Sequence, residues 1–146
     1  LDDRIDVVAT DHAPHTWEEK QNVYTKCPSG GPLVQHFLNV MLENYHNGKI
    51  SLEKIVEKMC HNPAILFRIE KRGFIKEGYK ADLVLVDLNQ EYTVSKENIL
   101  YKCGWSPLEE TVFHSKITHT FVNGHLAYEN GKFAEQKFGE RLLYEI

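Results

Sequence analysis

A short apolar run that ends in a cluster of polar side chains constrains this chain more than any other feature. Residues 5–9 are rich in β-branched side chains, and residues 10–15, with the sequence TDHAPH, follow at once. Such an apolar run is typical of a buried strand. In parallel α/β architectures, the loops at the carboxyl ends of the strands converge on one mouth. We therefore predict a strand over residues 5–9 and a functional site directly after it.

Helical periodicity follows the polar cluster. The apolar residues that recur at three- and four-residue steps are Leu33, Val34, Phe37, Leu38, Met41 and Leu42. Pro32 suits the first turn of this helix and Gly48 its end. A second helix is expected to begin with Ser51 as its N-cap, and a short third helix to run from Pro63 to Phe67. The residues expected to face inward on the second helix are Leu52, Ile55, Val56 and Met59.

From residue 73 the pattern changes to that of β-structure. Leucine and valine alternate over residues 83–88, which predicts a strand covered on both faces for most of its length. Residues 91–94 are expected to form another strand. The Asn-Gly pairs at 123–124 and 130–131 are strong hairpin signals. The second half is therefore predicted to be a small β unit.

Composition excludes several classes of protein. The chain has 146 residues and a formal net charge of -4, without the basic stripe typical of a nucleic-acid surface. No apolar run approaches the roughly 20 residues that span a bilayer. The three cysteines, Cys27, Cys60 and Cys103, are far apart and odd in number, which disfavours a disulfide framework. We expect a cytoplasmic protein that binds neither nucleic acid nor membrane.

The first residues suggest that the chain is a piece of a longer one. It opens on Leu1 rather than methionine, and the expected strand follows almost immediately, with no earlier element to pair with it. A buried strand needs hydrogen-bonded neighbours on both sides. We therefore expect an N-terminally truncated chain.

Asp11 and His15 are the strongest candidates for chemistry. A carboxylate at a strand end can ligate a divalent metal and also accept a proton, although an N-cap or turn aspartate is the alternative. Pro14 stiffens the turn before His15, whose ring could bind an anionic group or a metal, or could simply be solvated. His12 follows Asp11 directly and should point the other way, so we expect a structural hydrogen bond from its ring.

A glycine-containing turn before the first helix is a weaker candidate. Ser29, Gly30 and Gly31 expose main-chain groups that could hydrogen-bond a small polar ligand. The remaining histidines lack the spacing of metal ligands and are interpreted as structural or surface residues: His36, His46, His61, His114, His119 and His125. The chain contains no cysteine zinc motif, no phosphate-binding glycine motif and no nucleophile elbow.

Three stretches resemble one enzyme family. Residues 8–20, VATDHAPHTWEEK, resemble the last barrel strand and the following loop of dihydroorotases, in the amidohydrolase superfamily. Residues 62–88 resemble the stretch in which these enzymes leave the barrel and enter a β-sandwich. Residues 103–133 are similar to their closing segment. The string DHAPH is specific for dihydroorotases, whereas the C-terminal part is shared with hydantoinase-like relatives.

The resemblance implies an α/β fold and an activity. Residues 1–70 would be the last strand and helices of a (β/α)8 barrel, and residues 71–146 a portion of a small β-sandwich subdomain. The reaction would be the reversible hydrolysis of the cyclic amide of dihydroorotate to N-carbamoyl aspartate in pyrimidine biosynthesis. Zinc would be the cofactor, with two ions per intact site and most of their ligands upstream of this chain. The chain alone would then be inactive, and the intact enzyme could be a homodimer.

The resemblance also implies roles for four residues. Asp11 would match the aspartate that contacts one zinc ion and moves the proton to the ring nitrogen. His15 would match the histidine that binds the substrate carboxylate. Ser29 and Gly30 would match a loop whose backbone hydrogen-bonds the substrate, although the family often has an aromatic residue where Ser29 stands.

Two other functions stay open at this stage. A related cyclic amidohydrolase would act on hydantoins, dihydropyrimidines or allantoin, and a dihydroorotase-like scaffold would have lost catalysis. His15 favours an anionic substrate, because a neutral ring needs no such partner. The presence of both Asp11 and His15 argues against the scaffold.

Overall fold

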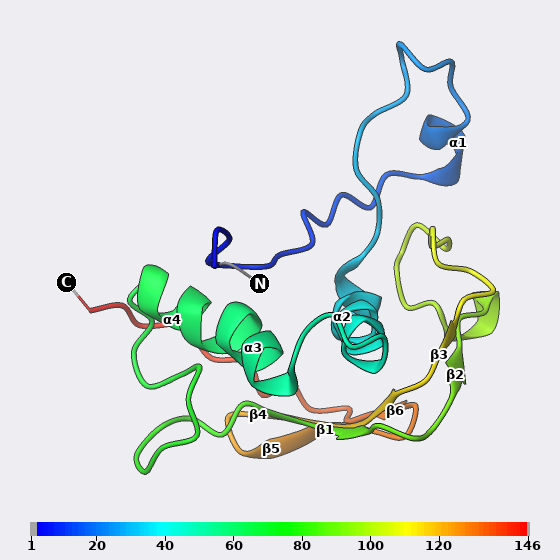
Figure 1. Ribbon diagram of the computed structural model, residues 1–146. Helices are drawn as coiled ribbons and strands as arrows, with labels where there is room; N and C mark the ends of the chain where they lie inside the picture. The colour runs from blue at the N-terminus through cyan, green and yellow to red at the C-terminus, as the bar shows by residue number, and fades with distance from the viewer. Residues whose placement is uncertain (1–2, 146) are drawn as a thin grey trace.

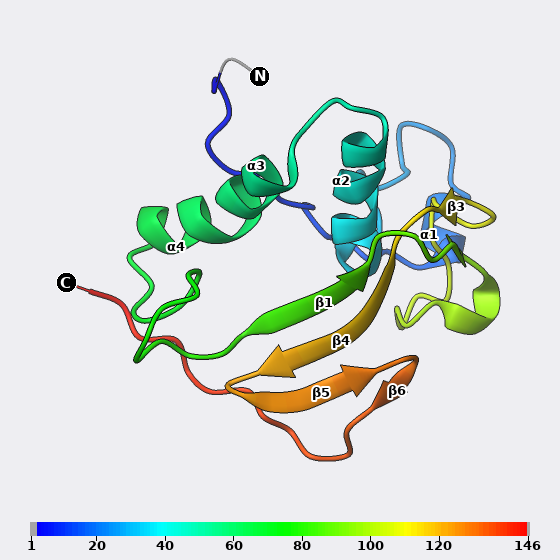
Figure 2. The ribbon, with the colours of Figure 1, turned by 60° about the horizontal axis from the view of Figure 1, so that its bottom comes forward.

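The computed structural model describes residues 3–145, in which a helical part precedes two antiparallel sheets (Figure 1). The helical elements are α1 (Trp17–Lys20), η1 (Val34–His36), α2 (Phe37–His46), α3 (Leu52–Val56), η2 (Glu57–His61), α4 (Asn62–Leu66) and η3 (Lys96–Asn98). The strands are β1 (Leu83–Asp87), β2 (Tyr92–Thr93), β3 (Val112–Phe113), β4 (Lys116–Val122), β5 (His125–Glu129) and β6 (Lys132–Phe133). Figure 2 shows α2, α3 and α4 along one side of the larger sheet.

The first predicted helix is confirmed as η1 continuing into α2. Its end follows the predicted pattern, because Gly48 has a φ of +67° and its N–H donates to the carbonyl of Tyr45 at 2.9 Å. The residues buried on this helix are His36, Asn39 and Leu42, at three-residue spacing. His36 is thus a core residue, and the buried side-chain amide of Asn39 has a hydrogen-bond partner, since it donates to the carbonyl of Ser115 at 3.0 Å.

The second and third predicted helices form one continuous helical segment, made of α3, η2 and α4. Ser51 is the predicted N-cap, and its hydroxyl accepts from the N–H of Lys54 at 3.2 Å. The π-turn of η2 comes just before Pro63, which lacks an N–H and whose ring crowds the carbonyl four residues earlier. Val56 was expected to face inward, but it is 43% exposed. No helix in the described part of the chain is long and apolar enough to cross a bilayer.

The larger sheet has the strand order β1-β4-β5-β6, with every pair antiparallel. Both predicted hairpins are confirmed, one between β4 and β5 and one between β5 and β6. Asn123 and Gly124 have φ values of 52° and 84°, and Asn130 and Gly131 have values of 46° and 91°. Two successive positive φ angles are what a type I′ turn requires, and Asn-Gly supplies them at low cost. The smaller sheet pairs β2 with β3.

The strand predicted over residues 5–9 is wrong for the described chain. These residues have no assigned strand, and Ile5 is 67% exposed. Val8 donates its N–H to the carbonyl of Lys58 at 3.2 Å, which is a contact with a helix and not with a strand. A strand exists only where neighbouring strands complete its hydrogen bonds, and local sequence does not supply them.

Strand β1 is present as predicted, but its expected burial on both faces is wrong. Leu83, Val84 and Leu85 are 37%, 46% and 49% exposed. The apolar side chains of this segment are typical of a buried strand, but the strand is buried only where other segments pack against its faces. The predicted α/β class holds. The division into barrel and sandwich parts at residue 70 remains a prediction.

Candidate active site

Two loops that are separate in the sequence lie against each other. We call residues 10–16 the acid loop and residues 28–31 the glycine loop. The N–H of Ala13 donates to the carbonyl of Gly31 at 3.0 Å, and His12 and Gly31 form a parallel β-bridge. The structure thus brings together the loop that carries Asp11 and His15 and the turn that carries Ser29 and Gly30.

Asp11 lies in the left-handed region and is exposed. Its φ of 46° is a conformation that aspartate and asparagine tolerate better than most residues. The N-cap alternative for Asp11 is excluded, because Thr16 caps α1 through its hydroxyl. Asp11 is therefore an exposed residue of the acid loop, and its main-chain oxygen lies near Gly30 of the glycine loop.

His15 is held by a tight turn and by a carboxylate. Its N–H donates to the carbonyl of Ala13 at 2.9 Å across Pro14, which makes a three-residue turn. Its ring Nδ1 lies 3.5 Å from Oε2 of Glu19, and the same oxygen accepts from the N–H of Thr16 at 2.8 Å. The side chain of His15 is 36% exposed, so part of the ring can meet a ligand.

The structural role predicted for His12 is confirmed. Its Nδ1 accepts from the N–H of Leu33 at 3.1 Å and from that of Val34 at 3.4 Å, at the start of η1. A ring nitrogen that accepts a hydrogen bond carries no proton. His12 therefore joins the acid loop to the first helix through its ring.

The sequence did not point to two further residues that contact the loops. The ammonium group of Lys20 donates to the carbonyls of Pro28 and Gly30 at 2.6 and 3.0 Å. The indole N–H of Trp105 donates to the carbonyl of His15 at 2.8 Å, across a separation of 90 residues. No local pattern signals the contact of Trp105, because this residue is remote from the motif, and nothing about Lys20 in the sequence indicates that it turns toward the glycine loop.

The described residues do not form a complete metal site. Within residues 3–145, no group of three or more His, Cys, Asp or Glu side chains could hold a metal ion. The cysteines Cys27, Cys60 and Cys103 are free. A zinc site in a protein needs three or four ligands. Asp11 could supply one ligand at most, so the residues present do not fit zinc by themselves.

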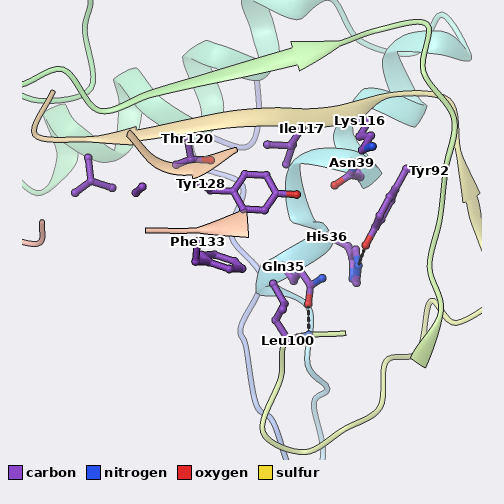
Figure 3. Close-up of a pocket in the computed structure, with 12 residues that line it drawn as sticks. Gln35, His36, Asn39, Tyr92, Leu100, Lys116, Ile117, Thr120, Tyr128 and Phe133 are labelled. Carbon is purple, nitrogen blue, oxygen red and sulfur yellow. Dashed lines mark hydrogen bonds between the residues drawn. The ribbon is translucent and has the colours of Figure 1, made fainter. Parts of the chain in front are cut away.

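A cavity of about 360 Å³ lies elsewhere, between α2 and the larger sheet (Figure 3). None of Asp11, His15, Ser29 and Gly30 is among the residues that line it. His36 does line it, and Nε2 of its ring lies 3.5 Å from the hydroxyl of Tyr92. Burial lowers the pKa of His36, which favours the neutral ring there. This cavity and the acid loop are separate features.

The whole chain was compared with known proteins. The model of the "Amidohydrolase family" matches residues 2–127. The multifunctional protein pyr1-3 of Dictyostelium discoideum is 39% identical over 141 residues, which are 96% of this chain and 6% of that protein. A dihydroorotase of Pyrococcus furiosus is 36% identical over 97% of this chain and 33% of its own length.

Solved structures agree with the sequence relatives. The L-hydantoinase (dihydropyrimidinase) of Arthrobacter aurescens has a TM-score of 0.86 and 29% identity, covering 94% of this chain and 32% of that one. A D-hydantoinase (dihydropyrimidinase) from a Thermus species has a TM-score of 0.84 and 26% identity, covering 91% and 30%. This chain spans about a third of these structures and of the Pyrococcus relative. On the family match and the shared fold, the chain belongs to the amidohydrolase family.

Proposed function

We propose that this chain is the C-terminal part of a zinc-dependent dihydroorotase, which reversibly hydrolyses dihydroorotate to N-carbamoyl aspartate in pyrimidine biosynthesis. One observation carries the proposal: the acid loop, which holds the exposed Asp11 and the partly exposed His15, is hydrogen-bonded to the glycine loop. Similarity to proteins described as dihydroorotases supports the choice of substrate.

Asp11 is the proposed proton carrier. A carboxylate at the surface of a substrate site can accept a proton during attack on the amide and return it to the leaving ring nitrogen. Asp11 is also the proposed contact of this chain with zinc, which would supply Lewis-acid chemistry when bound. The other zinc ligands must come from outside this chain, since residues 3–145 contain no sufficient group.

His15 is the proposed partner of the substrate carboxylate. The turn across Pro14 and the contact with Glu19 give its ring a set direction. Ser29 and Gly30 are the proposed source of main-chain hydrogen bonds to the substrate, because their turn lies exposed beside the acid loop. Dihydroorotate carries both a carboxylate and ring amide groups, so these two kinds of contact would bind its two ends.

Activity and zinc binding are proposed to depend on the rest of the enzyme. We expect the isolated 146-residue chain to be inactive and to lack stoichiometric zinc, and its exposed apolar side chains to promote self-association. A cytoplasmic location and a homodimeric intact enzyme belong to the same proposal. The free cysteines are compatible with a reducing compartment.

The alternative is a related cyclic amidohydrolase that acts on a neutral ring. The solved structures described as hydantoinases favour it, since their TM-scores reach 0.86. The two functions differ at His15, because a neutral ring offers no carboxylate for an imidazole to bind. A comparison of the hydrolysis of dihydroorotate with that of a neutral ring therefore distinguishes the two functions.

Asp11→Asn in the full-length zinc-containing enzyme tests the proposed proton carrier. Asparagine tolerates the positive φ of this position, so the loop should keep its shape while the carboxylate is lost. We expect kcat for dihydroorotate to fall at least about a hundredfold. Asp6→Asn, at an exposed aspartate in the same segment, is the matched control and should keep full activity. Normal turnover by the Asp11→Asn enzyme would refute the assignment.

A further inference from the structure

A segment from the second half of the chain lies against the acid loop. We call residues 98–107 the tryptophan segment; it begins at the end of η3. In Figures 1 and 2 the yellow-green chain between η3 and β3 runs beside the blue α1 region. The chain on either side of the segment is held together next to the smaller sheet. The N–H of Val94 donates to the carbonyl of Thr111 at 3.0 Å, and the N–H of Glu110 donates to the carbonyl of Val94 at 2.9 Å.

Trp105 makes the contact closest to the candidate site. Its indole N–H donates to the carbonyl of His15 at 2.8 Å, in a partly buried position. The edge of its ring would lie 3.9 Å from a side-chain carbon at Gly31, and the ring meets that of Trp17 edge-to-face at 5.7 Å. Trp105 therefore lies near the glycine loop and is bonded to the acid loop, where it fixes the main chain of the residue whose imidazole is proposed to bind the substrate.

Tyr101 makes a second connection from the same segment. Its ring lies 5.3 Å from that of His12, and its hydroxyl accepts from the N–H of Gln35 at 2.9 Å. The side chain of Gln35 in turn donates to the carbonyl of Asn98 at 2.7 Å and accepts from the N–H of Leu100 at 2.8 Å. The tryptophan segment is thus fixed to the start of the first helix, so Trp105 bonds His15 from a rigid support.

We propose that Trp105 is a positioning residue, whose indole N–H sets the orientation of His15 toward an anionic substrate group. This inference rests on the proposed function, and it adds a residue that binds no substrate itself. A hydrogen bond to the carbonyl of His15 restrains the backbone at that point, and the ring direction follows from the backbone. Losing the bond should weaken recognition of the carboxylate and leave the proton transfer at Asp11 largely intact.

The test is Trp105→Phe in the full-length enzyme, which keeps an aromatic ring but removes the N–H donor together with the outer ring carbons that lie near Gly31. We expect the KM for dihydroorotate to rise about threefold to tenfold with kcat changed less than about twofold. In a His15→Gln background the same substitution should have no further effect on KM, because the imidazole that the contact orients is gone. Trp17→Phe, which removes the other indole N–H of the aromatic pair, is the matched control and should leave KM within about twofold.

Amide hydrogen exchange separates this inference from the proposed function. Trp105→Phe should speed exchange over residues 11–17 in the full-length protein, whether or not dihydroorotate is its substrate. If the unsubstituted enzyme fails to hydrolyse dihydroorotate but exchange still rises, the proposed function fails and the positioning contact stands. Unchanged exchange, or an equal KM effect of Trp105→Phe with and without His15, would overturn the inference.

Discussion

Gly30 lies directly against Ala13, so that a methyl group added to Gly30 would come within 2.6 Å of the Ala13 Cβ atom. Gly30 also has a φ of +83°, a conformation that side chains rarely adopt. The close approach of the acid loop and the glycine loop therefore depends on the absence of a side chain at this position. The arrangement of the candidate site therefore depends on the contact between Gly30 and Ala13 as well as on its polar residues.

Gly30→Ala is expected to separate the two loops. Its matched control is Gly78→Ala, because Gly78 has a φ of +78° but no atom within 4 Å of its added carbon. The control should cost about 1 kcal/mol from backbone strain alone, and Gly30→Ala about 1–3 kcal/mol more from crowding. Urea unfolding of both variants measures the difference. Equal destabilisation would mean that crowding against Ala13 does not change the free energy of unfolding.

Substitution of the turn asparagine should destabilise the protein more in the β4–β5 hairpin than in the β5–β6 hairpin. The side chain of Asn123 accepts from Arg72 at 2.6 Å and donates to the carbonyl of Phe138 at 2.5 Å. Asn123→Gly keeps the positive φ but loses both hydrogen bonds, so we expect a loss of about 2 kcal/mol relative to Asn130→Gly. Asn130 has nearly the same φ and is exposed, which makes it the control. Matching unfolding midpoints for the two variants would contradict this prediction.

His36 should make stability fall in mild acid. Burial holds its pKa in the folded chain below the ordinary value of 6.5, so the unfolded chain takes up the proton first as the pH falls. The contribution of His36 is therefore complete above about pH 6.5 and decreases below it. His36→Phe removes this titration, and its stability should decline less than that of the unsubstituted protein between pH 7.5 and pH 5.5. Parallel declines would show that His36 is not responsible.

Local chemistry explains what could be predicted from the sequence. The Asn-Gly turns and the Ser51 N-cap depend on residues near each other in the chain. The acid loop was recognisable for the same reason, since Asp11 and His15 stand four residues apart. Features of this kind need no knowledge of remote partners.

Long-range contacts explain what could not be predicted. The contact between Trp105 and His15 spans 90 residues, and neither residue signals the other. The expected strand over residues 5–9 fails because strand formation depends on neighbours that local sequence does not specify. The sequence predicts a structural or surface role for His36 without choosing between them, and its burial, which makes it structural, follows from the sheet that packs beside α2.

The proposed substrate is dihydroorotate only if His15 recognises a substrate carboxylate. The most direct measurement is the steady-state kinetics of the full-length zinc enzyme and its His15→Gln variant on dihydroorotate and on dihydrouracil, which lacks the carboxylate. We predict hydrolysis of dihydroorotate, with a KM raised at least about tenfold by His15→Gln and no comparable change for the neutral ring. Preferred hydrolysis of dihydrouracil, with a KM for dihydroorotate indifferent to His15, would contradict the account.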